Sequence, residues 1–223
     1  MEHRFIKHTF LLAIVILLLC GCSIVNINKQ SIDEIVDDIL STNTNLKTIS
    51  LEGYSYYLPQ GVNLKSNKFM NSVLYYNHRK MYLYVDLLSY YYKVDNSYKE
   101  NGSYYSRKLD FNNKTGYLEI NELDNEYYIE FMYNYSKIEA YTKKEDLNKT
   151  LTVMAYILNS VKFQNNVLDS LVGEGALNYK EEQYNIYKSN NNDSDFLDIA
   201  EQYDDGRKNS KDEDILDIGK NLE

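Results

Sequence analysis

Five glutamates in the middle of the chain are the residues best placed for acid–base chemistry. They are Glu119, Glu122, Glu126, Glu130 and Glu139. Hydrolysis of a glycosidic bond needs two carboxyl groups at a set separation in a cleft, and pairing strands could bring two of these together. The basic side chains of Arg107, Lys137 and Lys143 are equally placed to bind them, and surface ion pairs are the commoner result. We therefore expect ion pairs here and no catalytic residue.

His78 is the single histidine after the N-terminal segment, and it lies beside Asn77 and Arg79 near a strand end. A catalytic triad would need a partnered serine and acid, and no Gly-x-Ser-x-Gly elbow is present. A zinc site would need more His or Cys than this region contains. No glycine-rich phosphate loop exists either. We expect His78 to be a surface residue, with no metal and no cofactor bound.

The spacing of Asn191, Asp193 and Asp195 matches the first, third and fifth positions of an EF-hand calcium loop. The loop needs a glycine at its sixth position and a bidentate glutamate at its twelfth. Phe196 and Gln202 stand there instead. The sequence therefore predicts no calcium site in this segment.

Tyrosine is unusually frequent, with 24 residues and no tryptophan. Many occur as neighbours within β-like segments: Tyr56/Tyr57, Tyr75/Tyr76, Tyr90/Tyr91/Tyr92, Tyr104/Tyr105 and Tyr127/Tyr128. In a strand such neighbours place one ring in the core and the other at the surface. A row of exposed rings could bind a sugar or peptide, although tyrosine is also simply a good strand former. The lack of tryptophan weakens the sugar hypothesis in particular.

Cys22 follows a basic N-terminus and an apolar run from Phe10 to Leu19. The run has about ten residues, half of what a membrane-spanning helix needs, and is typical of a secretion signal. Its ending, Leu19-Cys20-Gly21-Cys22, resembles the lipobox of bacterial lipoproteins. The resemblance implies a signal peptide over residues 1–21 and a diacylglycerol, with palmitate-type acyl chains, on the Cys22 thiol. Both cysteines lie here, so the remaining chain has no disulfide and no thiol nucleophile.

The net charge of −9 is unevenly distributed along the chain. Residues 23–163 contain 16 Lys/Arg and 17 Asp/Glu, whereas residues 164–223 contain 6 Lys/Arg and 15 Asp/Glu. No basic stripe exists to bind a phosphate backbone, so we expect no nucleic-acid partner. Anionic lipid headgroups would repel the acidic tail, which should project away from the membrane.

Helical periodicity occurs at two places, one before and one after a series of β-like segments. Ser31-x-x-Glu34 forms a capping box, and an apolar stripe follows to about Leu40 with an acidic, solvated opposite face. Residues 147–161 repeat apolar side chains at spacings of three and four, which indicates a core-facing helix. The expected strands cover residues 54–58, 69–76, 81–92, 103–111, 117–121, 126–133 and 137–142, with a turn at 101–102, a hairpin loop at 112–116 and a last extended piece at 160–163.

These elements predict an α+β domain over residues 31–163, after a tether at 22–30. Its antiparallel sheet would have five to seven strands, with the N-terminal helix and the C-terminal helix packed on it. The segments Tyr54-Ser55-Tyr56-Tyr57-Leu58-Pro59-Gln60-Gly61 and Ile157-Leu158-Asn159-Ser160-Val161-Lys162-Phe163 resemble parts of the PsbP-like α/β/α sandwich. That fold serves mostly in binding and assembly, so the resemblance does not supply a function.

The tail, residues 164–223, should be largely disordered, with short helical patches. Its segment 193–199 echoes segment 212–218 at an offset of 19 residues. Two such copies could dock on a partner as short helices, or they could be a chance echo or fold back onto the domain. The residues that would dock are Phe196, Leu197, Ile199, Ile215, Leu216 and Ile218.

Together these features predict a lipoprotein on the extracytoplasmic face of a bacterial cell membrane. We expect it to be a non-catalytic binding or assembly module, with another envelope protein as its partner. The alternative is a solute- or glycan-binding lipoprotein that uses surface tyrosines.

Overall fold

The computed structural model describes residues 27–68, 70–95 and 97–173. It is an α+β structure with two antiparallel sheets. The larger sheet has seven strands in the order β3-β4-β5-β9-β8-β7-β6, and the smaller has three in the order β1-β2-β10. The strands of the larger sheet are β3 (Asn63–Lys68), β4 (Asn71–Tyr76), β5 (Arg79–Val85), β6 (Tyr105–Phe111), β7 (Lys114–Leu123), β8 (Glu126–Tyr133) and β9 (Ser136–Lys143). Those of the smaller sheet are β1 (Ile49–Leu51), β2 (Tyr54–Tyr56) and β10 (Lys162–Phe163).

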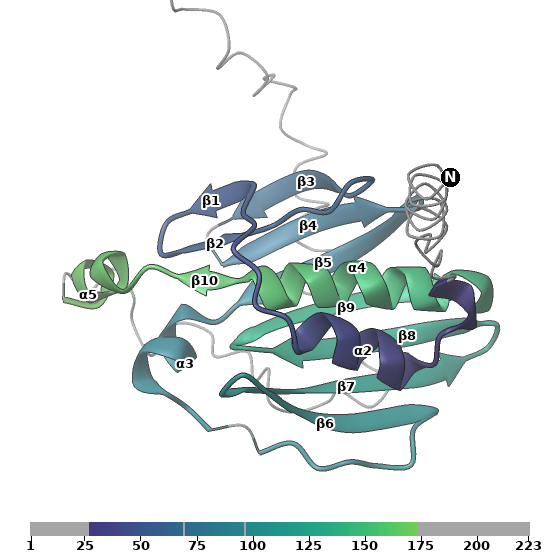
Figure 1. The fold of residues 1–223 in the computed structure, drawn as a ribbon. Helices are drawn as coiled ribbons and strands as arrows, with labels where there is room; N and C mark the ends of the chain where they lie inside the picture. Colours follow the sequence, from purple (N-terminus) through teal and green to yellow (C-terminus); the bar gives the residue numbers. More distant parts are fainter. Residues whose placement is uncertain (1–26, 69, 96, 174–223) are drawn as a thin grey trace, which may run out of the picture.

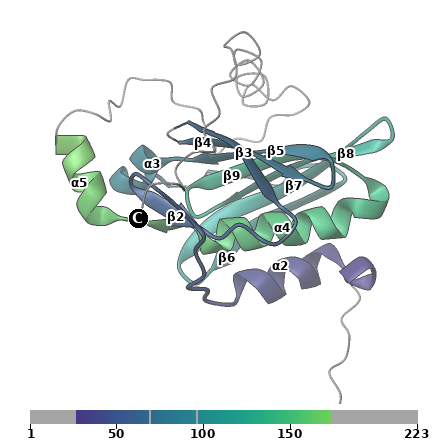
Figure 2. The same cartoon turned by 90° about the horizontal axis from the view of Figure 1, so that it is seen from above.

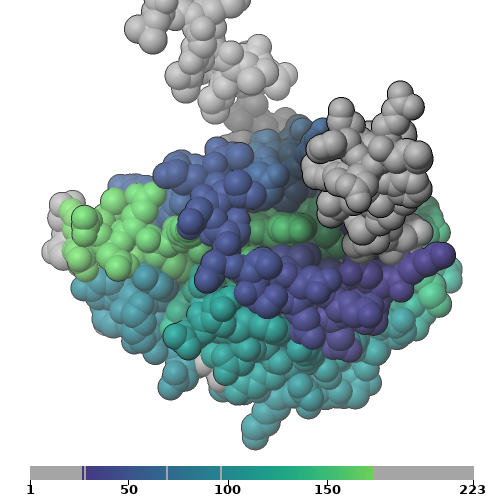
Figure 3. Space-filling view, viewed as in Figure 1, coloured from purple at the N-terminus to yellow at the C-terminus, as the bar shows by residue number. Residues whose placement is uncertain are grey.

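Two helices cover one face of the seven-stranded sheet (Figures 1 and 2). Helix α4 (Leu147–Ser160) lies over the central strands β9 and β8, and α2 (Ile32–Leu40) packs beside it. In the space-filling view, only part of α4 shows between α2 and the small sheet (Figure 3). The other helices of the described residues are η1 (Ile27–Lys29), α3 (Leu87–Tyr92), η2 (Lys144–Asp146) and α5 (Asn165–Gly173). Among the described residues, no helix combines the length and hydropathy needed to cross a membrane.

The core lies between α4 and the sheet face that it covers. Alternate residues of the central strands point there, such as Leu83 and Phe131, while Leu151 and Met154 descend from α4; all four are buried. This follows from the period of two in the strands and the longer period of the helix. Leu168 on α5 also enters this core, so the packed structure continues beyond Phe163.

Two-residue turns join several strands and fix their register. Asn77–His78, Asn112–Asn113 and Asn134–Tyr135 each have positive φ at both residues, the geometry that suits the twist of a hairpin. The hairpin loop expected at residues 112–116 is therefore wrong in length, because Lys114 already pairs with Phe111. Gly116 then lies within β7, where a Cβ would stand 2.0 Å from the carbonyl oxygen of Met132.

The strand expected over residues 81–92 is wrong in its second half. Strand β5 ends at Val85, and Asp86 caps α3 by accepting a hydrogen bond from the backbone N–H of Ser89 at 2.8 Å. An aspartate at this position favours a helix start over continued strand pairing. The expected strand at 69–76 begins only at Asn71, and β3 before it had no clear sequence pattern.

Candidate functional site

Three of the five candidate glutamates meet on the sheet face opposite α4, here called the outer face. Glu139 on β9 lies directly opposite Glu130 on β8, and Glu130 lies directly opposite Glu119 on β7. All three side chains are fully buried. We call this set the glutamate row. Like charges placed opposite each other destabilise a sheet, so the row requires compensating groups.

Lys137, two residues before Glu139 on β9 and on the same face, supplies that compensation for two of the three. Its Nζ lies 3.0 Å from Oε1 of Glu130 and 2.8 Å from Oε1 of Glu139, and all three side chains have zero exposure. The expectation that a nearby base binds the glutamates is confirmed. The expectation of a surface location is wrong, because buried aromatic and sulfur-containing side chains share this face: Tyr82, Tyr84, Tyr117, Tyr128 and Met132.

Glu119 is held differently, by three neutral donors. Tyr98 Oη and Asn101 Nδ2 donate to its Oε2 at 2.9 and 2.8 Å, and Asn121 Nδ2 donates to its Oε1 at 3.0 Å. Tyr98 and Asn101 belong to residues 97–104, here called the strap, which passes over the sheet before β6. Burial, followed by the Glu119 carboxylate, raises the pKa of Tyr98. The sequence indicated only a turn at 101–102 and did not reveal these contacts.

The Tyr98 ring fixes the strap by stacking on Tyr117 of β7. The ring centroids are 4.2 Å apart and the planes differ by 8°. Offset stacking of this kind adds to the free energy gained from burial alone. The strap thus closes one end of the glutamate row with both an aromatic contact and hydrogen bonds.

The other two candidate glutamates lie apart from the row. Glu126 accepts a hydrogen bond from Arg79 at 2.6 Å, and the pKa of Glu126 is lowered by that guanidinium. Glu122 accepts a hydrogen bond from Tyr127 at 3.3 Å. Burial and the neighbouring Tyr104 hydroxyl raise the pKa of Tyr127 to about 12. Neither carboxylate therefore joins the outer-face cluster.

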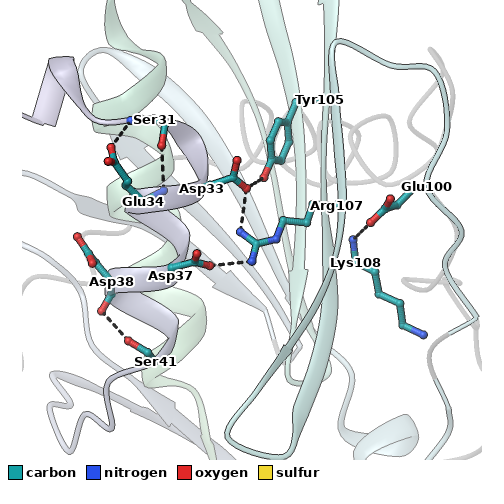
Figure 4. A network of polar contacts seen from close by, with 10 residues as sticks. All are labelled: Ser31, Asp33, Glu34, Asp37, Asp38, Ser41, Glu100, Tyr105, Arg107 and Lys108. Atoms are coloured by element: carbon teal, nitrogen blue, oxygen red, sulfur yellow. Dashed lines mark hydrogen bonds and ion pairs between the residues drawn. The ribbon is translucent and has the colours of Figure 1, made fainter.

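Arg107, expected near the glutamates, instead joins the edge strand β6 to α2 (Figure 4). Its guanidinium donates to Asp33 at 2.9 Å and to Asp37 at 2.7 Å. Tyr105 donates to the same Asp33 oxygen at 2.7 Å. The acidic face of α2 is exposed, as expected, but two of its carboxylates also bind the domain. The predicted capping box of Ser31 and Glu34 is confirmed.

The most exposed tyrosines do not share one surface row. They are Tyr91, Tyr92, Tyr104, Tyr141 and Tyr156, on α3, the strap, β9 and α4. The ring centroids of Tyr91 and Tyr92 are 5.2 Å apart, so these two rings contact each other. Tyr104 instead packs on Tyr127, and Tyr141 packs on Tyr128. The expected division of each tyrosine pair between core and surface fails for Tyr127 and Tyr128, which are both buried. The sugar- or peptide-binding platform stays a prediction.

His78 is exposed in the β4–β5 turn, as expected. Among the described residues, no three His, Cys, Asp or Glu side chains converge as a metal site would require. Cys22, the calcium-like segment at 191–202 and the six tail residues Phe196, Leu197, Ile199, Ile215, Leu216 and Ile218 lie outside the described residues. Comparison of the chain with protein-family models, curated proteins and solved structures gave no match.

Proposed function

We propose that this chain is an extracytoplasmic lipoprotein, anchored through a lipid on Cys22, whose α+β domain is a non-catalytic binding or assembly module. The observation that most directly supports the anchor is the sequence Leu19-Cys20-Gly21-Cys22 just before a firmly attached first helix. Because η1 (Ile27–Lys29) is already attached to α4, the free part of the tether from Cys22 to Ile27 spans at most roughly 17 Å at full extension. Such a tether holds the domain close to the bilayer.

The attachment of α2 suits a helix that follows directly on an anchor. Besides the Arg107 ion pairs, Asn112 donates to the carbonyl of Leu40 at 2.9 Å, and Asn159 donates to that of Ile39 at 2.7 Å. Asn148 of α4 donates to the carbonyls of Ile27 and Gln30. A pulling force on the tether is therefore transmitted to α4 and to the sheet, and it does not act on α2 alone.

The binding role is supported by the state of the carboxylates. A hydrolase of the glycosidase type presents an acid and a base to a substrate in a cleft. Here the glutamate row is buried, and each of its members binds a neighbouring side chain. A diacylglyceryl group supplies two acyl chains, which is enough for stable membrane retention. The partner is then an envelope protein that meets the domain or the tail.

Cell fractionation tests the anchor, with Cys22→Ser as the variant that lacks the reactive thiol. We expect the unaltered chain in the membrane fraction and the variant outside it. A pulldown from detergent-solubilised membranes, with the full chain and with a chain lacking residues 190–223, tests the binding role. A partner lost with the deletion would bind the tail, and a partner retained would bind the domain. If Cys22→Ser fractionated like the unaltered chain, the proposed anchor would be contradicted. If neither the full chain nor the shortened chain captured a specific partner, the proposed binding role would be contradicted.

A further inference from the structure

The dipeptide Asn101-Gly102 lies in the strap at the point where the strap contacts the glutamate row. It is the one Asn-Gly pair in the sequence. Asparagine followed by glycine is the pair most open to intramolecular attack, because glycine has no side chain to hinder the approach of its backbone nitrogen. Both residues are exposed, and no heavy atom lies within 4 Å of the place where a Gly102 Cβ would be. Water can therefore reach Asn101 and Gly102, and the backbone there has room to move as the attack requires.

The side chain of Asn101 already lies over the following backbone. Its Oδ1 accepts a hydrogen bond from the N–H of Ser103 at 3.0 Å. This contact folds the amide back along the chain, beside the peptide group of Gly102. Its Nδ2 simultaneously donates to Oε2 of Glu119 at 2.8 Å. The same amide group is thus both the chemical target and the link between the strap and the buried carboxylate.

We infer that Asn101 is a site of spontaneous deamidation and that its conversion loosens the strap from Glu119. The backbone nitrogen of Gly102 bonds to Cγ of Asn101, the Cγ–Nδ2 bond breaks, and Nδ2 leaves as ammonia with the proton of the attacking N–H. Water then opens the succinimide at either carbonyl. The products are aspartate and isoaspartate at position 101.

The product reverses the interaction at Glu119. The amide donor becomes a carboxylate against a carboxylate that has no exposure to solvent. Oε2 of Glu119 keeps Tyr98 and loses Asn101, and the new charge repels it at close range. An isoaspartate also lengthens the main chain. This disturbs the contacts of Asn101 with Ser106, where the Asn101 N–H donates to Oγ at 3.2 Å and the Ser106 hydroxyl donates to the Asn101 carbonyl at 2.9 Å.

The test is to age the folded full-length protein at mildly alkaline pH and to follow peptides by mass spectrometry. We expect the mass gain of amide-to-acid conversion at Asn101 before it occurs at the exposed Asn113, which is followed by Lys114. Gly102→Ala is the matched control: nothing opposes the added methyl group, and loss of the converted peptide is expected. Hydrogen exchange should then show faster exchange in residues 97–104 of the aged protein and of Asn101→Asp.

Two results would overturn the inference. One is an intact Asn101 in protein whose other exposed asparagines have reacted. The other is a converted residue 101 with unchanged exchange in the strap. The aged protein is folded before it reacts. Hydrogen exchange in its strap can therefore be compared with that of fresh protein even if Asn101→Asp fails to fold.

Discussion

Glu130 on β8 and Glu139 on β9 lie directly opposite each other, and both carboxylates bind the ammonium group of Lys137. The three side chains have no exposed surface. A buried charge that loses its partner keeps the cost of its desolvation without the compensating attraction. The folded protein therefore tolerates the three buried groups together, and removal of one of them should destabilise it.

Lys137→Met should lower the free energy of unfolding by about 3–5 kcal/mol, because it leaves two buried carboxylates facing each other. Adding Glu130→Gln and Glu139→Gln removes both charges and should recover much of this loss. Urea denaturation of the single and triple variants measures the difference. A single variant as stable as the unaltered protein would mean that Lys137 does not hold the pair.

Arg107→Ala should lower the free energy of unfolding by about 1 kcal/mol, because its ion pairs with Asp33 and Asp37 are partly exposed to solvent. A double-mutant cycle with Asp37→Ala isolates the pair from other effects of each change. Lys108→Ala on the same strand is the control, since Lys108 is exposed and points away from α2 (Figure 4). Zero coupling in the cycle would show that Arg107 does not attach the helix.

Gly116→Ala should prevent β7 and β8 from pairing normally. The added Cβ would lie 2.0 Å from the Met132 carbonyl oxygen and 2.8 Å from Tyr133 Cα, both backbone atoms that cannot rotate away. We expect a loss above about 4 kcal/mol, or insoluble protein. Gly102→Ala, in open space, should remain as stable as the unaltered chain. Equal stability of the two variants would contradict the close approach of the strands.

Asp86→Asn tests a pH effect that follows from burial. Burial raises the pKa of Asp86 above its ordinary value of 3.8. Below pH 3.8 the Asp86 carboxyl is protonated in both the folded and the unfolded protein. As the pH rises from there through the raised pKa of the folded state, the free energy of unfolding falls. Asparagine also caps helices well, so the variant should be more stable than the unaltered protein at neutral pH, with the difference vanishing in acid. Denaturation at several pH values checks this, and a pH-independent difference would contradict it.

The sequence predicted the elements whose patterns are local. The capping box at Ser31, the apolar stripe of α4 and the run of β-branched and aromatic residues in β8 are each encoded within a few residues, and the structure has the corresponding elements. The α+β class with a large antiparallel sheet followed from their order. The strand β3 escaped prediction because its side chains alternate only weakly between polar and apolar.

The candidate site was predictable only in part, because its contacts join residues far apart in the chain. That bases would bind glutamates on neighbouring strands followed from the period of two. The burial of the outer face could not be predicted in this way, because tyrosines are found both in cores and at surfaces. The strap contacts of Tyr98 and Asn101 with Glu119 depend on a path of the chain that no local pattern specifies.

Mass spectrometry of the N-terminal peptide tests the anchoring proposal most directly. The protein would be purified in detergent from the membranes of a bacterium that processes lipoproteins. We expect a peptide that begins at Cys22 and carries a diacylglyceryl thioether, with residues 1–21 removed. A peptide with an unmodified Cys22 thiol, or one that still contains the leader, would contradict it.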